Sequence, residues 1–532
     1  MKRIHIIFAL ALALSLLVGC GAADSGNAAS AENTASISGT KIAFGDGKIT
    51  ASSTDGVEID GTALTITDAG TYVLSGSCAD GSVTVEKGVD GVTLVLDGLT
   101  LTSETTAPIV CGKGSRVTIE AAAGTENTLT DTESNNDETG NADAENAVIK
   151  SKDGSQVVLC GAGTLHVQAN GKNGVKSGAT TEDGEASLTI RGLTLNIDAP
   201  VNDAVNAEAA LEVESGTLIL SAGDDALHCD YALNIGAEGT DGPSVTVTSC
   251  YEGLEGAAVN VFSGKVSIQS TDDCINAANA DLTGYSYTLN IFGGTITAHS
   301  DSGDGFDSNG DLTISGGSVA VWTANAADNE PLDADGTVTV SGGTVLAAGG
   351  SGGMGMSLAA AQPCVIFGGT TKMPGENVQN GQPGAGGQPN GKELPSGEER
   401  PDGEGRPVQG SLGGASLLTQ DNSFAITNGD GTVLYTGEAA YNASFVFFSS
   451  ADLSEGESYT LISGETQTDS TAQTGTVSIG MGSMGSMGGP GGQRPDGTPP
   501  SGGMGGQKPD GSTPPEKPEG ENTLHNGSDA KA

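Results

Sequence analysis

Basic and aromatic side chains are scarce in this sequence of 532 residues. It has 21 Lys and Arg against 67 Asp and Glu, and aromatic residues make up 4%. The formal net charge of −46 argues against nucleic acid and anionic membrane surfaces as direct partners, because both would repel the chain. The five histidines are scattered, without the two-cysteine, two-histidine spacing of a zinc site. Crowded carboxylates need counter-charge to stay ionised, so we expect metal cations as partners.

The sequence also lacks a clear membrane span at its N-terminus. The apolar run from Ile6 to Val18 follows a basic start and is too short to cross a bilayer in the ordinary way. Residues 1–20 are therefore predicted to be an export signal. The run ends in Leu17-Val-Gly-Cys20, which resembles the bacterial lipoprotein cleavage box. We expect lipidation at Cys20 and anchoring to the outer face of the bacterial membrane through that lipid alone. A plain secretory signal with a chance cysteine is the alternative.

What the sequence does contain is a short repeated pattern of a polar or acidic residue, a small one, an apolar one and a polar or charged one. Its copies begin at Asn173, Asp203, Asp225, Glu252, Asp273, Asp304 and Glu330. The apolar third residues, spaced 21 to 31 apart, are Val175, Val205, Leu227, Leu254, Ile275, Phe306 and Leu332. Internal periods of this size indicate a solenoid, in which each repeat buries its apolar face against its neighbours.

Strands with tight corners lie between these copies. Segments such as 311–321 alternate apolar and polar residues with period two and are split by glycine pairs such as Gly316-Gly317. Glycine permits the positive φ that such a corner requires. No amphipathic helical stretch interrupts the pattern. Three short strands per repeat predict an all-β fold, a single-stranded parallel β-helix with β caps at its ends.

Four acidic segments and two outlying ones carry a family resemblance. They are 251–256 (YEGLEG), 272–277 (DDCINA), 304–310 (DGFDSNG), 331–336 (PLDADG), 69–76 (AGTYVLSG) and 455–461 (EGESYTL). Together they resemble the calcium-containing parallel β-helix proteins that bind cellulose and polygalacturonate, over roughly residues 40 to 465. The resemblance implies a right-handed β-helix of pectate-lyase-like shape whose acidic turns hold calcium. The chain departs from the pattern at Cys274, where glycine is usual, and in long glycine-rich insertions.

Composition divides the chain into six parts. Low-complexity segments rich in Gly, Pro and Ser cannot bury enough apolar area to offset the entropy of ordering. The predicted parts are a lipoprotein signal at 1–20, a flexible tether at 21–38, the β-helix at 39–365, a disordered insertion at 366–410, a C-terminal β cap at 411–465 and a disordered tail at 466–532.

The repeated pattern also predicts a metal site. Strand alternation points the apolar third residue inward and the second and fourth residues outward. The small second residues are then expected to leave room for a metal ion or a sugar. Calcium takes six to eight oxygen ligands, which stacked acidic turns would supply. The predicted ligands are Asp203, Asp224, Asp225, Glu252, Glu255, Asp272, Asp273, Asp304, Asp307, Glu330 and Asp333. A solvated acidic face of turn residues is the alternative.

A second outward row follows when the units are aligned on their glycine corners. It contains Gln168, Asp198, Ser221, Gln269, His299 and Trp322. An exposed indole at Trp322 would stack on a sugar ring, with hydrogen bonds from Gln269 and His299. The alternative is that Trp322, the only tryptophan, is a packing anchor covered by the long insertion. Seven cysteines besides Cys20 are expected to be mostly buried, although Cys229 and Cys250 are one repeat apart and could bond.

Three classes of function fit these features. The favoured one is a monomeric surface lipoprotein that uses calcium to bind an acidic or cellulosic polysaccharide without cleaving it. The second is a calcium-dependent lyase, for which Lys150 and Lys176 are the available bases in the outward row. Against it, these lysines are several turns from the densest acids. The third is a structural adhesin without glycan specificity.

Overall fold

The computed structural model describes residues 37–181, 184–279, 282, 284–324, 329–350, 356–369 and 416–479. The predicted signal with Cys20, nearly all of the tether, most of the insertion and the tail from residue 480 lie outside these residues. The described part is all-β, with 38 strands and one 3-10 helix, η1 (Asp137–Thr139). No helix within it is long and apolar enough to cross a membrane.

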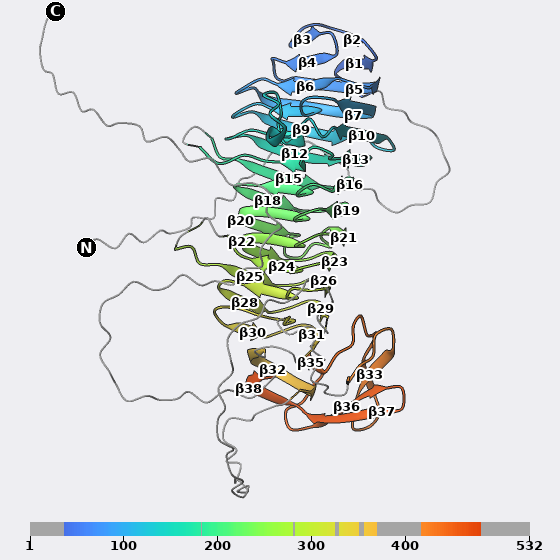
Figure 1. The fold of residues 1–532 in the computed structure, drawn as a ribbon, viewed down its shortest axis with the longest axis vertical. Helices are drawn as coiled ribbons and strands as arrows, with labels where there is room; N and C mark the ends of the chain where they lie inside the picture. The colour runs from blue at the N-terminus through green and yellow to red at the C-terminus, as the bar shows by residue number, and fades with distance from the viewer. Residues whose placement is uncertain are drawn as a thin grey trace, which may run out of the picture. The chain divides into compact units, whose positions relative to one another are not determined.

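Within the described residues, 34 strands belong to one sheet whose pairings are mostly parallel. Most strands pair with the third strand further along the chain, so the strands fall into three series (Figure 1). The β8 series contains β6 (Ser82–Val85), β8 (Ile109–Cys111), β11 (Ala147–Ser151), β14 (Asn173–Lys176), β17 (Val205–Ala207), the first parts of β20 (Leu227–Ile235) and β22 (Leu254–Val261), β24 (Ile275–Ala277) and β27 (Phe306–Ser308).

The other two series complete each repeat. The β9 series contains β5 (Gly70–Cys78), the first part of β7 (Asp90–Ser103), β9 (Arg116–Ala121), β12 (Gln156–Gly161), β15 (Ser187–Arg191), β18 (Ala210–Val213), the second parts of β20 and β22, β25 (Thr288–Ile291), β28 (Asp311–Ile314), β30 (Val338–Val340) and β32 (Ser357–Gly368). The β10 series contains the second part of β7, β10 (Glu126–Asp131), β13 (Thr164–Gln168), β16 (Thr194–Ala199), β19 (Thr217–Ala222), β21 (Ser244–Ser249), β23 (Lys265–Ser270), β26 (Thr295–Ser300), β29 (Ser318–Thr323) and β31 (Thr344–Gly349).

Antiparallel pairs begin the sheet. Strand β1 (Thr40–Gly45) pairs antiparallel with β2 (Lys48–Ala51), and β3 (Val57–Asp60) with β4 (Ala63–Ile66). Strands β1 and β4 then pair parallel with β5 and β6. Hairpin strands therefore cover the first parallel turn, as expected for the end of a repeat array.

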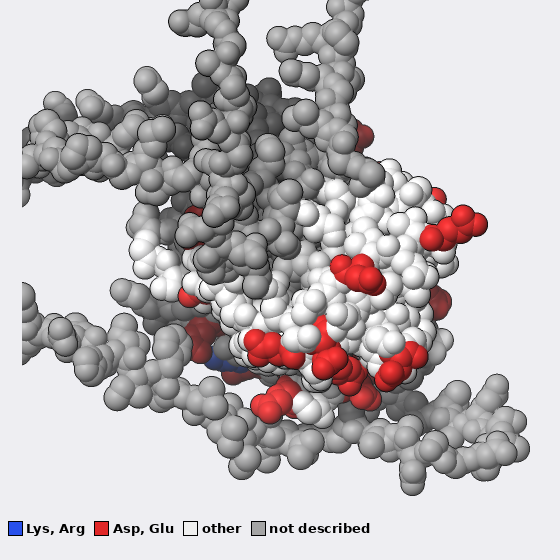
Figure 2. Space-filling view, turned by 90° about the horizontal axis from the view of Figure 1, so that it is seen from below, with Lys and Arg blue, Asp and Glu red and all other residues white. Residues whose placement is uncertain are grey.

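The C-terminal segment ends the sheet. Strand β35 (Phe445–Ser449) pairs antiparallel with both β31 and β32, and β38 (Gln473–Ser478) pairs with β32. A separate antiparallel sheet has the order β34 (Val433–Glu438), β33 (Ser423–Asn428), β36 (Ser458–Ser463) and β37 (Thr466–Thr471). Described residues 416–479 contain no Lys or Arg, and Figure 2 shows acidic side chains as separate patches on a largely uncharged surface in the view from this end.

The C-terminal strands continue beyond the predicted end of the β cap. Strands β37 and β38 extend the ordered chain to residue 479, beyond the predicted end of the cap at 465. This stretch contains few apolar residues, and its buried hydrophobic residues are Ala472, Val477 and Ile479. Backbone pairing with β32 and β36 orders it, and that pairing leaves little trace in the sequence.

The predicted inward row of apolar residues is confirmed. Val175, Val205, Leu227, Leu254, Ile275, Phe306 and Leu332 are all 0% exposed. Each is the register partner of the next across neighbouring strands. The glycine corners are also as expected, because Gly294, Gly317 and Gly343 all have positive φ. These corners and this core place the fourth residue of each copy on the outer side of the β8 series.

Candidate functional site

The fourth residues of the repeated pattern form one row across the β8 series. Register pairs link Lys150, Lys176, Asn206, His228, Glu255, Asn276 and Asp307 in that order. Asp333 follows Leu332, which bridges to Phe306. We name the row from Asn206 to Asp333, together with the first residues of the same copies, the acidic column. Those first residues are Asp203, Asp225, Glu252, Asp273, Asp304 and Glu330.

First-position carboxylates link successive turns. Asp203 Oδ1 accepts the N–H of Asp225 at 3.1 Å, and Asp273 Oδ1 accepts the N–H of Asp304 at 2.6 Å. Asp304 Oδ1 in turn accepts the N–H of Glu330 at 2.5 Å. Asp203 and Asp225 are only 3% and 6% exposed, so these two are not part of a solvated face. The carboxylates cap the backbone of the next turn.

The small second residues do not face outward, which corrects the prediction that they leave room for a ligand. Ala204, Ala226 and Cys274 are 0% exposed. A Cβ added to Gly305 would lie 2.1 Å from Val321 Cγ1 and 2.5 Å from the Pro331 carbonyl oxygen. The position is small because a packed side chain and the next turn approach it closely. Strict period-two alternation fails here because the chain is turning into the strand.

At one end of the acidic column, His228 stands among three carboxylates. Its Nδ1 lies 3.0 Å from Asp225 Oδ2 and 2.5 Å from Glu255 Oε2, and its Nε2 lies 3.0 Å from Asp230 Oδ1. Burial alone lowers the pKa of His228, but the hydrogen bonds to Asp225, Asp230 and Glu255 outweigh it and raise this pKa well above its usual value. The ring is therefore a cation supplied by the chain itself.

At the other end, carboxylates meet without such a partner. Oxygen atoms of Asp304, Asp307 and Asp333 lie within 4.8 Å of one another. Burial first, and then the charges of Asp273, Asp307 and Asp333, raise the pKa of Asp304 to about 8. Burial and then Asp333 raise the pKa of Asp307 to about 6. Within the described residues no ion pair joins these three side chains to Lys or Arg.

Carboxylates between the two ends also have raised pKa values. Burial raises the pKa of Asp273 to about 7, and neighbouring acids, with Asp307 first, add to this. Burial, then Glu255 and Asp225, raise the pKa of Glu252 to about 9.

Asn276 lies between the two ends of the column, as the register partner of Glu255 on one side and Asp307 on the other. It donates from Nδ2 to Glu252 Oε2 at 3.1 Å, and its Oδ1 is buried without a hydrogen-bond partner in the described part of the chain. A cation ligated by oxygen would use such an acceptor and relieve the crowding of Asp304, Asp307 and Asp333. This donor set therefore fits calcium.

Two predicted ligands stand beside these clusters. Asp224 offers an oxygen within 4.8 Å of those of Asp203 and Asp225. Asp272 lies close enough to contribute to the raised pKa of Asp273, but it is not one of the three clustered carboxylates of Asp304, Asp307 and Asp333.

The predicted sugar-stacking role of Trp322 is wrong. Its indole is 3% exposed and packs edge-on against Phe424, with ring centroids 5.8 Å apart. The register that aligns Gln269, His299 and Trp322 is confirmed. However, Gln269 Nε2 donates to Tyr441 Oη at 3.1 Å, and the His299 and Tyr441 ring centroids are 6.2 Å apart. The C-terminal segment returns from far along the chain and covers this later part of the row.

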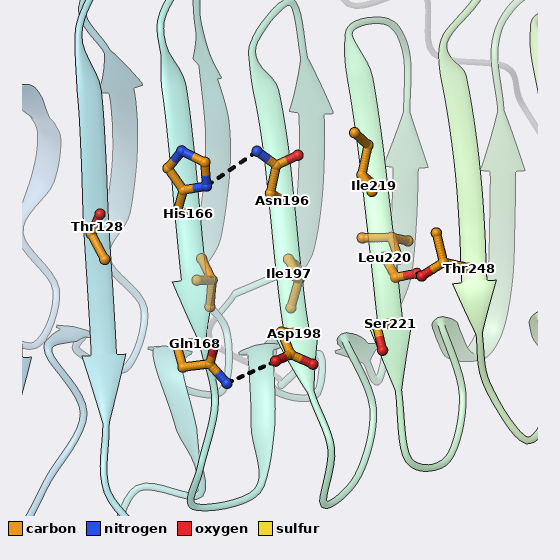
Figure 3. A pocket seen from close by; sticks show the side chains of 11 residues that line it. Thr128, His166, Gln168, Asn196, Ile197, Asp198, Ile219, Leu220, Ser221 and Thr248 are labelled. Atoms are coloured by element: carbon orange, nitrogen blue, oxygen red, sulfur yellow. Dashed lines mark hydrogen bonds between the residues drawn. The ribbon is translucent and has the colours of Figure 1, made fainter.

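The earlier part of the same row stays open and forms a groove. A cavity of about 330 Å³ crosses β10, β13, β16, β19 and β21, with its lining shown in Figure 3. We name it the polar groove. Gln168 Nε2 donates to Asp198 Oδ2 at 3.0 Å, and Asn196 Nδ2 donates to His166 Nδ1 at 3.2 Å. Sequence alignment on the corners already placed Gln168, Asp198 and Ser221 in one row.

Two features of the sites were missed at the sequence level. The repeated pattern places His228 in the outward row but assigns it no role, although the acids three residues before it and two residues after it are a usable signal. The sequence does not reveal the polar groove, because the four residues that form one of its rows share no residue type. They are Thr128, His166, Asn196 and Ile219. The possible disulfide does not form, since Cys229 and Cys250 are both buried free thiols.

Comparison with known proteins adds three findings. The model of a family described as carbohydrate-binding domain-containing protein matches residues 60–355, more than half of the chain. A carbohydrate-binding domain-containing protein of Acetivibrio thermocellus is 34% identical over 152 residues, which cover 28% of this chain and 52% of the relative. The chain thus spans about half the length of that relative.

A solved structure titled as a gadolinium derivative of the polysaccharide lyase-like protein from C. thermocellum also matches. It is 23% identical and covers 57% of this chain and 93% of its own, with a TM-score of 0.30, which is too low to carry an argument. The family match spans the acidic column and the polar groove alike. The chain belongs to the family of carbohydrate-binding domain-containing proteins.

Proposed function

We propose that the three series of strands form a right-handed parallel β-helix that binds polysaccharide with the help of calcium. The observation that carries the calcium part is the triad of Asp304, Asp307 and Asp333, whose oxygens crowd within 4.8 Å. Two of these acids have raised pKa values, and no Lys or Arg among the described residues pairs with the triad. Such a site favours a cation that prefers oxygen ligands.

Asp304, Asp307 and Asp333 would hold the ion. On the preceding turn, Asp273 accepts the Asp304 N–H and Asn276 is the register partner of Asp307. Bound calcium supplies positive charge to an otherwise acidic surface and open positions for ligand oxygens. An acidic glycan and a chain with net charge −46 repel each other without it. At the His228 end the imidazolium already occupies the space between Asp225 and Glu255, so we place the ion at the Asp304 end.

We propose binding without cleavage. A lyase needs a base within hydrogen-bond reach of the sugar that the metal holds. Lys176 is five strands away from Asp307 in the row, which is about 24 Å at about 4.8 Å per strand.

One observation favours the lyase as the second candidate. Burial, and then the charge of Lys176, lower the pKa of Lys150, as a catalytic base requires. Its metal would then lie at Asp203, Asp224 and Asp225, whose oxygens also cluster within 4.8 Å.

Native affinity electrophoresis tests the proposal. Gels containing polygalacturonate should retard the protein in calcium but not in chelator, and Asp304→Asn with Asp307→Asn should remove that retardation. The same glycan incubated with protein and calcium should form no unsaturated product absorbing in the ultraviolet. Steady product formation that is lost in Lys150→Ala or Lys176→Ala would establish the lyase instead. A protein that no glycan retards would be the structural adhesin.

We also propose that the protein is exported and held at the outer face of the bacterial membrane by lipid on Cys20. The support is the Leu17-Val-Gly-Cys20 segment of the sequence. Two acyl chains give stable anchoring where one is marginal. Wild-type protein should partition with membranes in a bacterial host and Cys20→Ala should not. Equal membrane association of the two proteins would contradict the anchor.

A further inference from the structure

The polar groove presents two parallel rows of side chains on the β10 series, well away in sequence from the Asp304 triad. Register pairs align Thr128, His166, Asn196 and Ile219 in one row, and Thr130, Gln168, Asp198 and Ser221 in the other. Five successive strands at about 4.8 Å spacing extend over about 19 Å. A groove of this length accommodates several sugar rings of a chain that runs across the strands.

Hydrogen bonds hold two side chains of the first row, His166 and Asn196, in place. Asn196 Nδ2 donates to His166 Nδ1, so the ring hydrogen lies on Nε2, which is 2.8 Å from Glu126 Oε2. The other amide atom, Asn196 Oδ1, is buried without a partner among the described residues. Pre-positioned polar side chains lose little conformational entropy on binding, which favours recognition of a ligand rich in hydroxyl groups.

The row also contains an exposed apolar side chain. Ile219 is 44% exposed and lies between Asn196 and Thr246 in register. A sugar ring has an apolar C–H face and a polar hydroxyl edge. An apolar contact flanked by amide and hydroxyl groups matches both.

Charge decides which class of glycan fits. Asp198 lines the groove, Glu126 adjoins it through His166, and neither Lys nor Arg is among the lining residues. A uronate carboxylate would meet these two acids with no cation between them.

We infer that the polar groove is a second glycan site that takes a neutral polysaccharide and needs no metal ion. The inference rests on the proposed polysaccharide binding and divides it between two surfaces. The acidic column holds acidic glycan through calcium, whereas the polar groove holds neutral glycan by hydrogen bonds and apolar contact.

The test is native affinity electrophoresis of the full chain in gels containing hydroxyethylcellulose, a soluble neutral glucan. Retardation is expected in chelator as well as in calcium. Gln168→Ala with Asn196→Ala should weaken it about tenfold, equivalent to about 1.4 kcal/mol. Ile219→Glu provides a second variant at an exposed position where folding is not at risk, and it should weaken retardation similarly. The calcium-dependent retardation by polygalacturonate should persist in both variants.

A matched control lies on the β9 series. Asn234 and Asn260 are asparagines in the same kind of cross-strand ladder, since Asn260 Nδ2 donates to Asn234 Oδ1 at 2.9 Å. Asn234→Ala with Asn260→Ala should leave retardation by hydroxyethylcellulose unchanged. Neutral-glucan retardation that appears only with calcium, or that survives both groove variants, overturns the groove assignment while the calcium proposal stands. No retardation by either glycan under any condition overturns both.

Discussion

At the His228 end of the acidic column, carboxylates from two turns meet a positively charged side chain, whereas at the Asp304 end three carboxylates meet one another. Both ends come from the same four-residue pattern and the same strand register. The charge balance differs because the fourth position carries His228 at one end and Asp307 at the other. A repeat therefore does not define a site, because the charge balance of each pair of turns depends on which residues the repeat carries.

The largest expected effect comes from removing the internal cation. His228→Ala leaves the buried Asp225 and the half-buried Glu255 without their shared cation, and breaking a buried pair from one side costs about 3–5 kcal/mol. We expect this loss in urea unfolding in chelator, together with a new stabilisation by calcium at this end. His166→Ala is the control, because its pair with Glu126 is exposed. Equal effects of the two substitutions would remove the distinction between the ends.

The second prediction concerns calcium binding to the wild-type protein. A ligand that binds only the folded state at 100 times its dissociation constant stabilises it by about 2.7 kcal/mol. Melting curves should rise in calcium and fall in chelator, and Asp304→Asn with Asp307→Asn should remove the difference. Asp97→Asn with Glu104→Gln, two exposed acids outside the column, should keep it. Identical curves with and without calcium in the wild type would contradict the site.

The third prediction is a pH dependence in chelator. The pKa values of Asp307, Asp273 and Asp304 are raised to about 6, 7 and 8, so the folded state binds more protons than the unfolded state. The stability from these groups is fully present below their unfolded pKa values and is lost as pH rises through 6 to 8. We expect the free energy of unfolding to fall steadily between pH 5 and 8 and calcium to reduce this fall. Stability that rises over this range would show that the carboxylates are not crowded.

The smallest expected effect is a change in the free energy of unfolding that has opposite signs at the two ends. In chelator, Asp304→Asn keeps an oxygen for the Glu330 N–H and removes one charge from the triad, so we expect stabilisation by about 1 kcal/mol. Asp225→Asn removes a charged partner of His228 and should destabilise the protein. Chemical denaturation of both variants at pH 8 measures this. Changes of the same sign would mean that the two ends do not differ in charge balance.

Much of the sheet could be predicted from the sequence because its rules are local. Val175 to Leu332 repeat as apolar third residues, and backbone pairing between neighbouring turns then aligns them. The outward row from Lys176 to Asp307 follows from the same register. Strict alternation does not hold at Gly305, where the close approach of Pro331 and not a ligand requires a small residue.

The features that could not be predicted depend on distant contacts. Trp322 is covered by Phe424, and Gln269 by Tyr441, from a segment whose return to this face no local pattern signals. The burial of Asp203 and Asp225 depends on backbone N–H groups of the next turn, which composition does not show. The charge balance at His228 could not be predicted from neighbouring residues alone, because Glu255, which contacts its ring, is 27 residues away in the sequence.

The return of the C-terminal segment has a consequence for the order in which the chain folds. Parallel turns pair residues one repeat apart and can form one after another as the chain emerges. The last edge is different, since Ser449 Oγ donates to Pro363 O across 86 residues and Ser357 meets Ser478 across 121. Until those residues arrive, β31 and β32 present open strand edges, the kind of surface on which chains aggregate. The C-terminal strands therefore pair last. A chain that stops before residue 445 keeps the edges of β31 and β32 unpaired and open to aggregation.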